Sequence, residues 1–460
     1  MIRFSKESRK ILNENKTSRK ELLARYRNEH ERLQTLLKIT RTIANELKLD
    51  RLLKSVMGEV RDALHADRCT VFLIDEKRQE LWSKVADGIE PGEIRFPLGK
   101  GIAGYVATTG NVLNIPDCYK DSRFNPEIDR QTGYHTRCML TFPMRNKKGE
   151  IIGVFQVLNK LNGVFTEEDE EMLDAISIIA SSQIENAQLY EEQEKTFDSF
   201  VETLSSTIDA RDPLTAGHSR RIMLYADEIA RLAGFSPDER RILRTSALLH
   251  DVGKIGIRES VLTKASRLTQ EEYEHIKQHV VITRNILSKI HFTRENQAIP
   301  EIASTHHEML DGSGYPDGLR GNDIPVGGRI LAIADVFDAL TSFRHYRDRM
   351  DFADVLDHLK SDSGIKYDAA LVESFEKISL YKLIEIMEDG HLEEMSPAES
   401  ETLRRHSLRD LETAVQANTE EQPDFVRIFK RFYYQQRNQP KRENVPMDPK
   451  EQNILEAMKK

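Results

Sequence analysis

The chain has 460 residues, more than one ordinary core holds, which predicts two or three domains. A hydrophobic share of 39% with 31% charged residues is typical of a soluble globular protein, and the net charge of −9 excludes a nucleic-acid partner held by bulk electrostatics. The first residues lack the apolar core of a signal peptide, and no apolar run approaches the roughly 18 residues of a membrane span. Three cysteines without a CxxC pair favour a reduced interior. We therefore expect a cytoplasmic protein without a membrane span.

The first part of the chain changes its apolar period twice. Residues 1–32 are highly charged and predict an exposed helix or a disordered arm. Helical spacing then begins at Leu33, and a second helix runs through Leu52, Val56, Val60 and Leu64. Four β-rich runs follow, paired around the polar turns EKRQ and NKKGE, at residues 69–75, 80–86, 140–145 and 151–159. These patterns predict an α+β ligand-sensing module over residues 33–190, with an antiparallel sheet and flanking helices.

A long helix is predicted over residues 167–210, because neither Pro nor Gly interrupts an apolar stripe there. The stripe consists of Met172, Ile176, Ile179, Gln183, Ala187 and Tyr190, with spacings of three and four and Gln183 as its one polar member, and continues with Phe197, Val201, Leu204 and Ile208. Such a stripe indicates a coiled-coil seam that joins two protomers into a homodimer. The alternative is an ordinary helix packed within one chain.

Histidine and aspartate residues gather in the second half of the chain, which reads as helical. His250 and Asp251 are adjacent at the end of an apolar helix, and the other candidates are His218, His279, His306, His307 and Asp335. Imidazole and carboxylate suit first-row metals, and one carboxylate can bridge two ions that hold both oxygens of a phosphoryl displacement. A lone histidine is more often an ordinary surface or core residue, and spacing alone does not decide between His275 and His279.

Four longer motifs resemble the HD-GYP family of metal-dependent HD phosphohydrolases. They are DPLTAGHSRR (212–221), HDVGKIGI (250–257), HHEMLDGSGYPDGL (306–319) and DVFDALTSFRHYR (335–347). The resemblance covers about residues 200–385 and implies an all-α domain that hydrolyses cyclic di-GMP to the linear dinucleotide pGpG, to GMP, or to both. Residues 386–460 are expected to form a helical C-terminal extension.

The same resemblance implies roles for individual residues. It implies that His218, His250, Asp251 and Asp335 bind one divalent metal, and that Asp251 bridges to a second metal bound by His279, His306 and His307. Iron or manganese is expected, with other metals open. Lys254 and Asp251 are the expected catalytic residues, Lys254 at the scissile phosphate, and the expected substrate contacts are Asp212, Tyr315, Arg344 and Arg347. Leu214 stands where three-metal members carry Glu, so we expect two metals.

The first module resembles a GAF domain, and the run NKLNGVFTEEDE matches the subset that binds cyclic nucleotides. Its matching positions are Asn159, Lys160, Phe165, Asp169 and Glu170. They imply cyclic AMP or cyclic GMP as a ligand. The alternatives are another small molecule, or no ligand and a purely dimerising role, and Lys160 and Asp169 could instead form a structural ion pair.

The predicted architecture is therefore a multidomain chain, in which a long helix joins an α+β GAF domain to an all-α HD-GYP domain. The leading hypothesis is a cyclic di-GMP phosphodiesterase regulated by its GAF domain. An HD hydrolase of another cyclic nucleotide or dinucleotide is one alternative. A non-catalytic cyclic di-GMP receptor that docks partners on its charged arm and helical tail is the other.

Overall fold

The computed structural model describes residues 23, 26–27 and 29–434, apart from 84–93, 212–216, 265, 267, 343–348 and 418–421. The chain divides into two compact units, Met1–Thr196 and Phe197–Lys460, which are taken in turn below.

The first unit is built on a six-stranded antiparallel sheet with the order β3-β2-β1-β6-β5-β4. Its strands are β1 (Ala66–Asp75), β2 (Glu80–Ser83), β3 (Ile94–Pro97), β4 (Leu113–Ile115), β5 (Met139–Arg145) and β6 (Ile151–Lys160). The four predicted β-rich runs are confirmed as β1, β2, β5 and β6, except that residues 84–86 of the second run lie outside the described residues. The sequence analysis missed β3 and β4 because runs of four and three residues are too short to show alternation.

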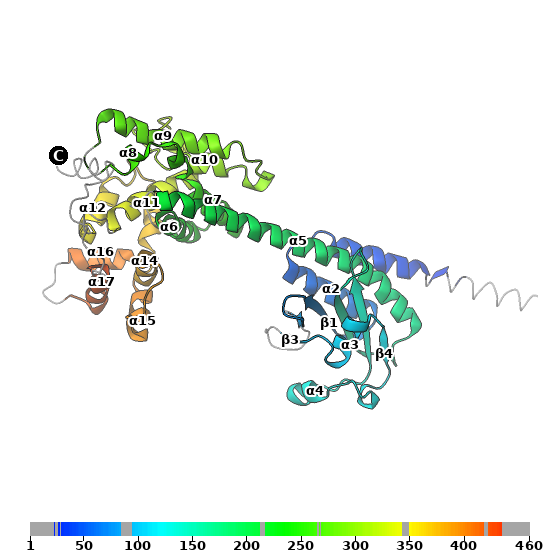
Figure 1. Cartoon of the computed structure of the whole chain (residues 1–460). Helices are drawn as coiled ribbons and strands as arrows, with labels where there is room; N and C mark the ends of the chain where they lie inside the picture. Colours follow the sequence, from blue (N-terminus) through cyan, green and yellow to red (C-terminus); the bar gives the residue numbers. More distant parts are fainter. Residues whose placement is uncertain are drawn as a thin grey trace, which may run out of the picture. The chain divides into compact units, whose positions relative to one another are not determined.

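Helices cover both faces of this sheet (Figure 1). They are a helix over residues 29–43, α2 (Leu49–Ala63), α3 (Gly101–Thr109), α4 (Glu127–Thr132), the short η1 (Cys118–Lys120) and the first part of α5 (Glu167–Arg211). Val71 and Phe155 lie in one core with α2 and α5, whereas their neighbours Phe72 and Val154 lie in another core with α3. The two-residue period of each strand therefore supplies both cores.

Two helical predictions need correction. The helix over residues 29–43 buries Ile39 and Ile43, whereas Leu33 and Leu37 are 61% and 53% exposed, so its buried face does not begin at Leu33. The stripe along α5 is also used within one chain. Ile176 and Ala187 are buried in the core of the first unit, and Val201 and Ile208 in the core of the second. Periodicity reveals an apolar face but not the surface that covers it. The four buried side chains are not available to a coiled-coil seam between protomers. The homodimer stays a prediction.

The second unit is a helical domain (Figure 1). Its helices after α5 are α6 (His218–Leu232), α7 (Pro237–Leu249), α8 (Glu259–Leu262), α9 (Gln270–Leu287), α10 (Ile299–Ala303), α11 (Val326–Thr341), α12 (Phe352–Ser361), α13 (Ala369–Glu376), α14 (Leu380–Met387), α15 (Pro397–Arg405), α16 (Leu408–Gln416) and α17 (Asp424–Tyr434), with short 3₁₀ turns η3 (Val252–Gly256), η4 (Arg294–Asn296) and η5 (Gly321–Asp323). Capping boxes at Ser236 and Thr269 fix where α7 and α9 begin.

Helix α11 runs through the centre of the domain and is buried on nearly every side. Its start lies against the end of α10, because a Cβ atom on Gly328 would meet Thr305 Oγ1 at 2.3 Å. This close approach, which only glycine permits, brings Asp335 of α11 next to the histidine pair that follows α10.

The C-terminal extension belongs to this domain as far as Tyr434. Val426, Phe429 and Tyr433 of α17 are buried in the same core as α11. Tyr433 also donates a hydrogen bond from its hydroxyl to the carbonyl of Met350. The described part of the predicted docking tail is therefore a structural part of the helical domain. Within the described ranges, no helix has the length and apolar character needed to span a membrane.

Candidate metal centre

The seven predicted metal-binding side chains converge in the second unit although they come from distant parts of the sequence. His218 begins α6, His250 and Asp251 follow α7, and His279 lies on α9. His306 and His307 follow α10, and Asp335 lies on α11. All seven are buried, and none is more than 8% exposed.

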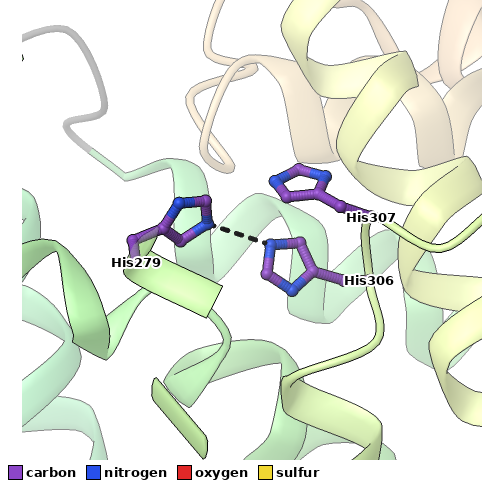
Figure 2. Close-up of side chains that lie close together, drawn as sticks. All are labelled: His279, His306 and His307. Carbon is purple, nitrogen blue, oxygen red and sulfur yellow. Dashed lines mark hydrogen bonds between the residues drawn. The ribbon is translucent and has the colours of Figure 1, made fainter. Parts of the chain in front are cut away.

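These side chains form two neighbouring groups. His218, His250 and Asp335 offer one set of donor atoms that lie within 4.8 Å of one another. His279, His306 and His307 offer a second such set, and Figure 2 shows their three rings turned toward one another. The Nε2 atoms of His279 and His306 are 3.5 Å apart.

Asp251 lies between the two groups and turns one carboxylate oxygen toward each. Oδ2 is 3.4 Å from His250 Nε2 and 3.9 Å from His218 Nε2. Oδ1 is 3.2 Å from His279 Nε2 and 4.0 Å from His306 Nε2. This is the arrangement that a carboxylate shared by two cations requires.

Backbone carbonyls fix the tautomer of three imidazoles. The Nδ1–H groups of His250, His279 and His306 each donate to the carbonyl three residues earlier, at 2.6, 2.7 and 2.8 Å. A carbonyl can only accept a hydrogen bond, so Nδ1 carries the proton and Nε2 turns a lone pair toward Asp251. Metal-binding histidines are usually oriented in this way.

His218 is oriented by Asp338, a residue that the sequence analysis missed. Nδ1–H of His218 donates to Asp338 Oδ2 at 2.8 Å. Arg221 donates to both oxygens of the same carboxylate, at 2.6 and 3.0 Å. Burial raises the pKa of Asp338, but Arg221 and His218 outweigh it and hold that pKa well below its usual range. The sequence signal that could have revealed Asp338 and Arg221 is their spacing: each lies one helical turn after a predicted metal ligand, Asp335 and His218.

Thr283 joins the His250–Asp251 segment to α9. Its hydroxyl donates to the carbonyl of His250 at 3.0 Å and accepts from the amide of Gly253 at 2.9 Å. A Cβ atom on Gly253 would lie 1.9 Å from the carbonyl of His279, so only glycine fits between these two ligand-bearing elements.

Lys254 places an ammonium group directly against the carboxylate at the centre of this cluster. Its Nζ atom lies 2.8 Å from Asp251 Oδ2, and the side chain is buried. Burial raises the pKa of Asp251, but Lys254 and His250 outweigh burial and hold that pKa well below its usual range. Asp251 is therefore ionised. Burial, reinforced by His250, lowers the pKa of His306 and keeps this imidazole neutral.

The glycine-rich loop after the histidine pair folds back onto it. Glu308 is buried, and its two carboxylate oxygens accept from the amides of Asp317 and Leu319 at 2.7 and 2.9 Å. The amide of Tyr315 donates to the carbonyl of His307 at 3.1 Å, and the two rings lie 4.8 Å apart. Tyr315 therefore lies beside the second histidine group, whereas Glu308 was not predicted.

The structure separates His279 from its alternative, His275. His279 lies in the cluster, whereas Nε2 of His275 accepts the amide of Arg258 at 3.2 Å. Asp212, Leu214, Arg344 and Arg347 lie outside the described residues.

The residues of the first unit that were expected to bind a cyclic nucleotide make contacts inside that unit. Lys160 Nζ lies 2.5 Å from both oxygens of Asp169, which confirms the structural ion pair. Asn159 hydrogen bonds the backbone of residues 135, 137 and 138. Asn114 donates to both the Phe165 carbonyl and the Glu170 carboxylate. These contacts lock β6 and α5 to their neighbours and give no support for direct ligand binding.

The residues of the cluster fit a pair of divalent cations. His250 Nε2 and Asp251 Oδ1 are buried and have no hydrogen-bond partner among the described residues. Orphaned buried acceptors are costly unless a ligand binds to them. The nitrogen and carboxylate donors suit first-row transition metals.

Comparisons with known proteins agree with both units. A GAF domain model matches residues 48–184, and an HD domain model matches residues 202–371. The chain is 36% identical over 208 residues to 3'3'-cGAMP-specific phosphodiesterase 2 of Vibrio cholerae, a match that covers 45% of this chain and 40% of the relative. It is 39% identical over 186 residues to a dual 3',5'-cyclic-AMP and -GMP phosphodiesterase 11A of Takifugu rubripes, covering 38% and 21%.

A third relative is a cyclic di-GMP phosphodiesterase of Thermotoga maritima, 40% identical over 182 residues, with 39% of this chain and 48% of the relative covered. The chain spans less than half the length of each of these three relatives. The two domain matches show that the chain carries a GAF domain followed by an HD domain.

Proposed function

We propose that the HD domain is a metal-dependent phosphodiesterase that hydrolyses cyclic di-GMP to pGpG, to GMP, or to both. The observation that carries this proposal is the position of Asp251, with one oxygen toward each group of imidazoles. His218, His250 and Asp335 would hold one divalent cation, and His279, His306 and His307 the other. Such cations supply Lewis-acid activation of the phosphodiester and of water when bound.

The other residues of the site bind and orient the substrate in this proposal. The Lys254 ammonium already faces an ionised carboxylate, and an anionic phosphate is the natural second partner for it. Tyr315 offers a ring beside the second histidine group on which a nucleobase can stack. Asp212, Arg344 and Arg347 remain proposed substrate contacts on the strength of the motif resemblance.

The matched relatives favour 3'3'-cGAMP as a second candidate substrate, because one of them is named for that activity. Steady-state turnover by the full chain loaded with Mn²⁺ or Fe²⁺ decides among the readings. Faster conversion of cyclic di-GMP than of 3'3'-cGAMP, cyclic AMP or cyclic GMP supports the proposal. Preferred conversion of another nucleotide would replace the substrate, and tight binding without conversion would make the protein a receptor.

Regulation by the GAF domain is part of the proposal. Helix α5 is continuous from Glu167 to Arg211 and contributes buried side chains to both domains. A ligand acts through it only if its affinity differs between two states of the protein. Cyclic AMP and cyclic GMP are the ligands to test first; if neither binds the GAF domain, the sensor ligand belongs to another class.

A further inference from the structure

The last turn of α5 is hydrogen bonded directly to the segment that carries Lys254. The guanidinium of Arg211 donates from Nη1 to the carbonyl of Lys254 at 3.3 Å and also to the carbonyl of Ile255. Its Nη2 donates to the carbonyl of Ile257 at 2.8 Å. One side chain therefore holds three carbonyls within four consecutive residues.

These carbonyls lie at the C-terminal end of η3, where the Lys254 carbonyl accepts from the Ile257 amide and a helical turn offers few further donors of its own. A cation at such an end is favourable because it faces the negative end of the aligned peptide dipoles. A guanidinium adds a planar fork of donors that one ammonium group cannot reproduce.

Lys254 is consequently held from both sides of its backbone. Its amide donates to the carbonyl of Asp251 at 2.9 Å, and its carbonyl accepts from Ile257 as well as from Arg211. The side chain then reaches Asp251 Oδ2 from a fixed starting point. Removing the guanidinium would leave the Lys254 carbonyl with the Ile257 amide as its remaining donor.

The end of α5 is itself fixed against the metal cluster. Val201 and Ile208 are buried in the same core as Leu249 and Val252, the residues that flank His250 and Asp251. At the next residue, Asp209 Oδ1 accepts a hydrogen bond from Ser219 Oγ at 2.8 Å, next to His218. Arg211 is therefore placed by the same packing that places the ligands.

We infer that Arg211 is a positioning residue that fixes Lys254 for the phosphate through the backbone of η3. This inference rests on the proposed function, since it assigns Lys254 to the substrate. It also makes the end of α5 the point at which a displacement of that helix reaches the site.

A double-mutant cycle tests this role. Arg211→Ala should lower kcat for cyclic di-GMP about 10- to 100-fold while the bound Mn²⁺ per chain is unchanged, because a small misplacement of a catalytic group is costly. In the Lys254→Ala background the same change should lower kcat less than about twofold, since the group it positions is gone. Arg211→Lys should recover part of the loss. Arg231→Ala, which removes an arginine from the surface of α6, is the matched control and should leave kcat unchanged.

Hydrogen exchange supplies a readout that needs no turnover. In Arg211→Ala, exchange of the Lys254 and Ile257 amides should rise about tenfold or more, while amides of α9 and α11 stay protected. Unchanged exchange at these two amides, or equal losses of kcat with and without Lys254, overturns the inference. A wild-type chain that converts no cyclic nucleotide refutes the proposed function instead, and the exchange experiment still decides whether Arg211 holds this turn.

Discussion

Asp338 accepts a hydrogen bond from Nδ1 of His218 at 2.8 Å and is itself held by Arg221. Asp338→Asn removes the charge opposite Arg221 and offers an amide that cannot satisfy both donors. We expect a loss of about 3–5 kcal/mol in the free energy of unfolding of the helical domain. We also expect about 10- to 100-fold weaker Mn²⁺ binding. Denaturant unfolding and metal titration measure the two effects.

Asp227→Asn is the control for this change. Asp227 lies on the same helix α6 and pairs with Arg240 and Arg244, away from any imidazole of the cluster. It should cost stability but leave Mn²⁺ affinity unchanged. Equal Mn²⁺ affinity in Asp338→Asn and wild type would show that Asp338 does not orient His218.

The loop that bears Tyr315 depends on Glu308. A glutamine there has one acceptor oxygen for two amides, and its NH₂ group faces a backbone donor. Glu308→Gln should destabilise the domain by about 1–3 kcal/mol and raise KM for cyclic di-GMP while bound metal is retained. Glu301→Gln, an exposed change on α10, should alter neither quantity. A KM equal to that of wild type would show that this loop does not contribute to substrate binding.

Residues of the site could be predicted from the sequence when their partners are close along the chain, and not when their partners are far away along the chain. The metal-binding candidates were found because motifs preserve residue types at fixed local spacing, as in the adjacent His250 and Asp251. Thr283 and Arg211 were missed because their value lies in contacts with His250 and Ile257, 33 and 46 residues away. The apolar stripe of α5 predicted the helix correctly, but periodicity carries no information about which surface covers it.

The C-terminal helix α17 is expected to stabilise the helical domain. Phe429 is buried against Phe352, with ring centroids 4.8 Å apart. Phe429→Ala should lower the free energy of unfolding by about 3–5 kcal/mol. Phe200→Ala, at a position 62% exposed on α5, should change it by no more than about 0.5 kcal/mol. If both variants unfolded alike, α17 would not be part of the cooperative core.

The ion pair between Lys160 and Asp169 is expected to act on the stability of the GAF domain. Both side chains are largely buried, and removing one partner leaves the other charge uncompensated. Lys160→Met should therefore cost about 3–5 kcal/mol. Lys120→Met breaks an exposed, solvent-screened pair with Asp117 and should cost far less stability than Lys160→Met. Denaturant unfolding of both variants checks this, and similar costs would argue against a structural lock.

The central claim, a carboxylate shared by two cations, is tested most directly by metal analysis of purified protein together with cyclic di-GMP turnover. We predict two bound divalent ions per chain and turnover in the wild type and in Asp227→Ala. In Asp251→Ala we predict loss of most of the metal and of turnover, with the fold retained. A wild-type chain that binds no divalent metal, or an Asp251→Ala chain that keeps both ions and full turnover, would contradict the account.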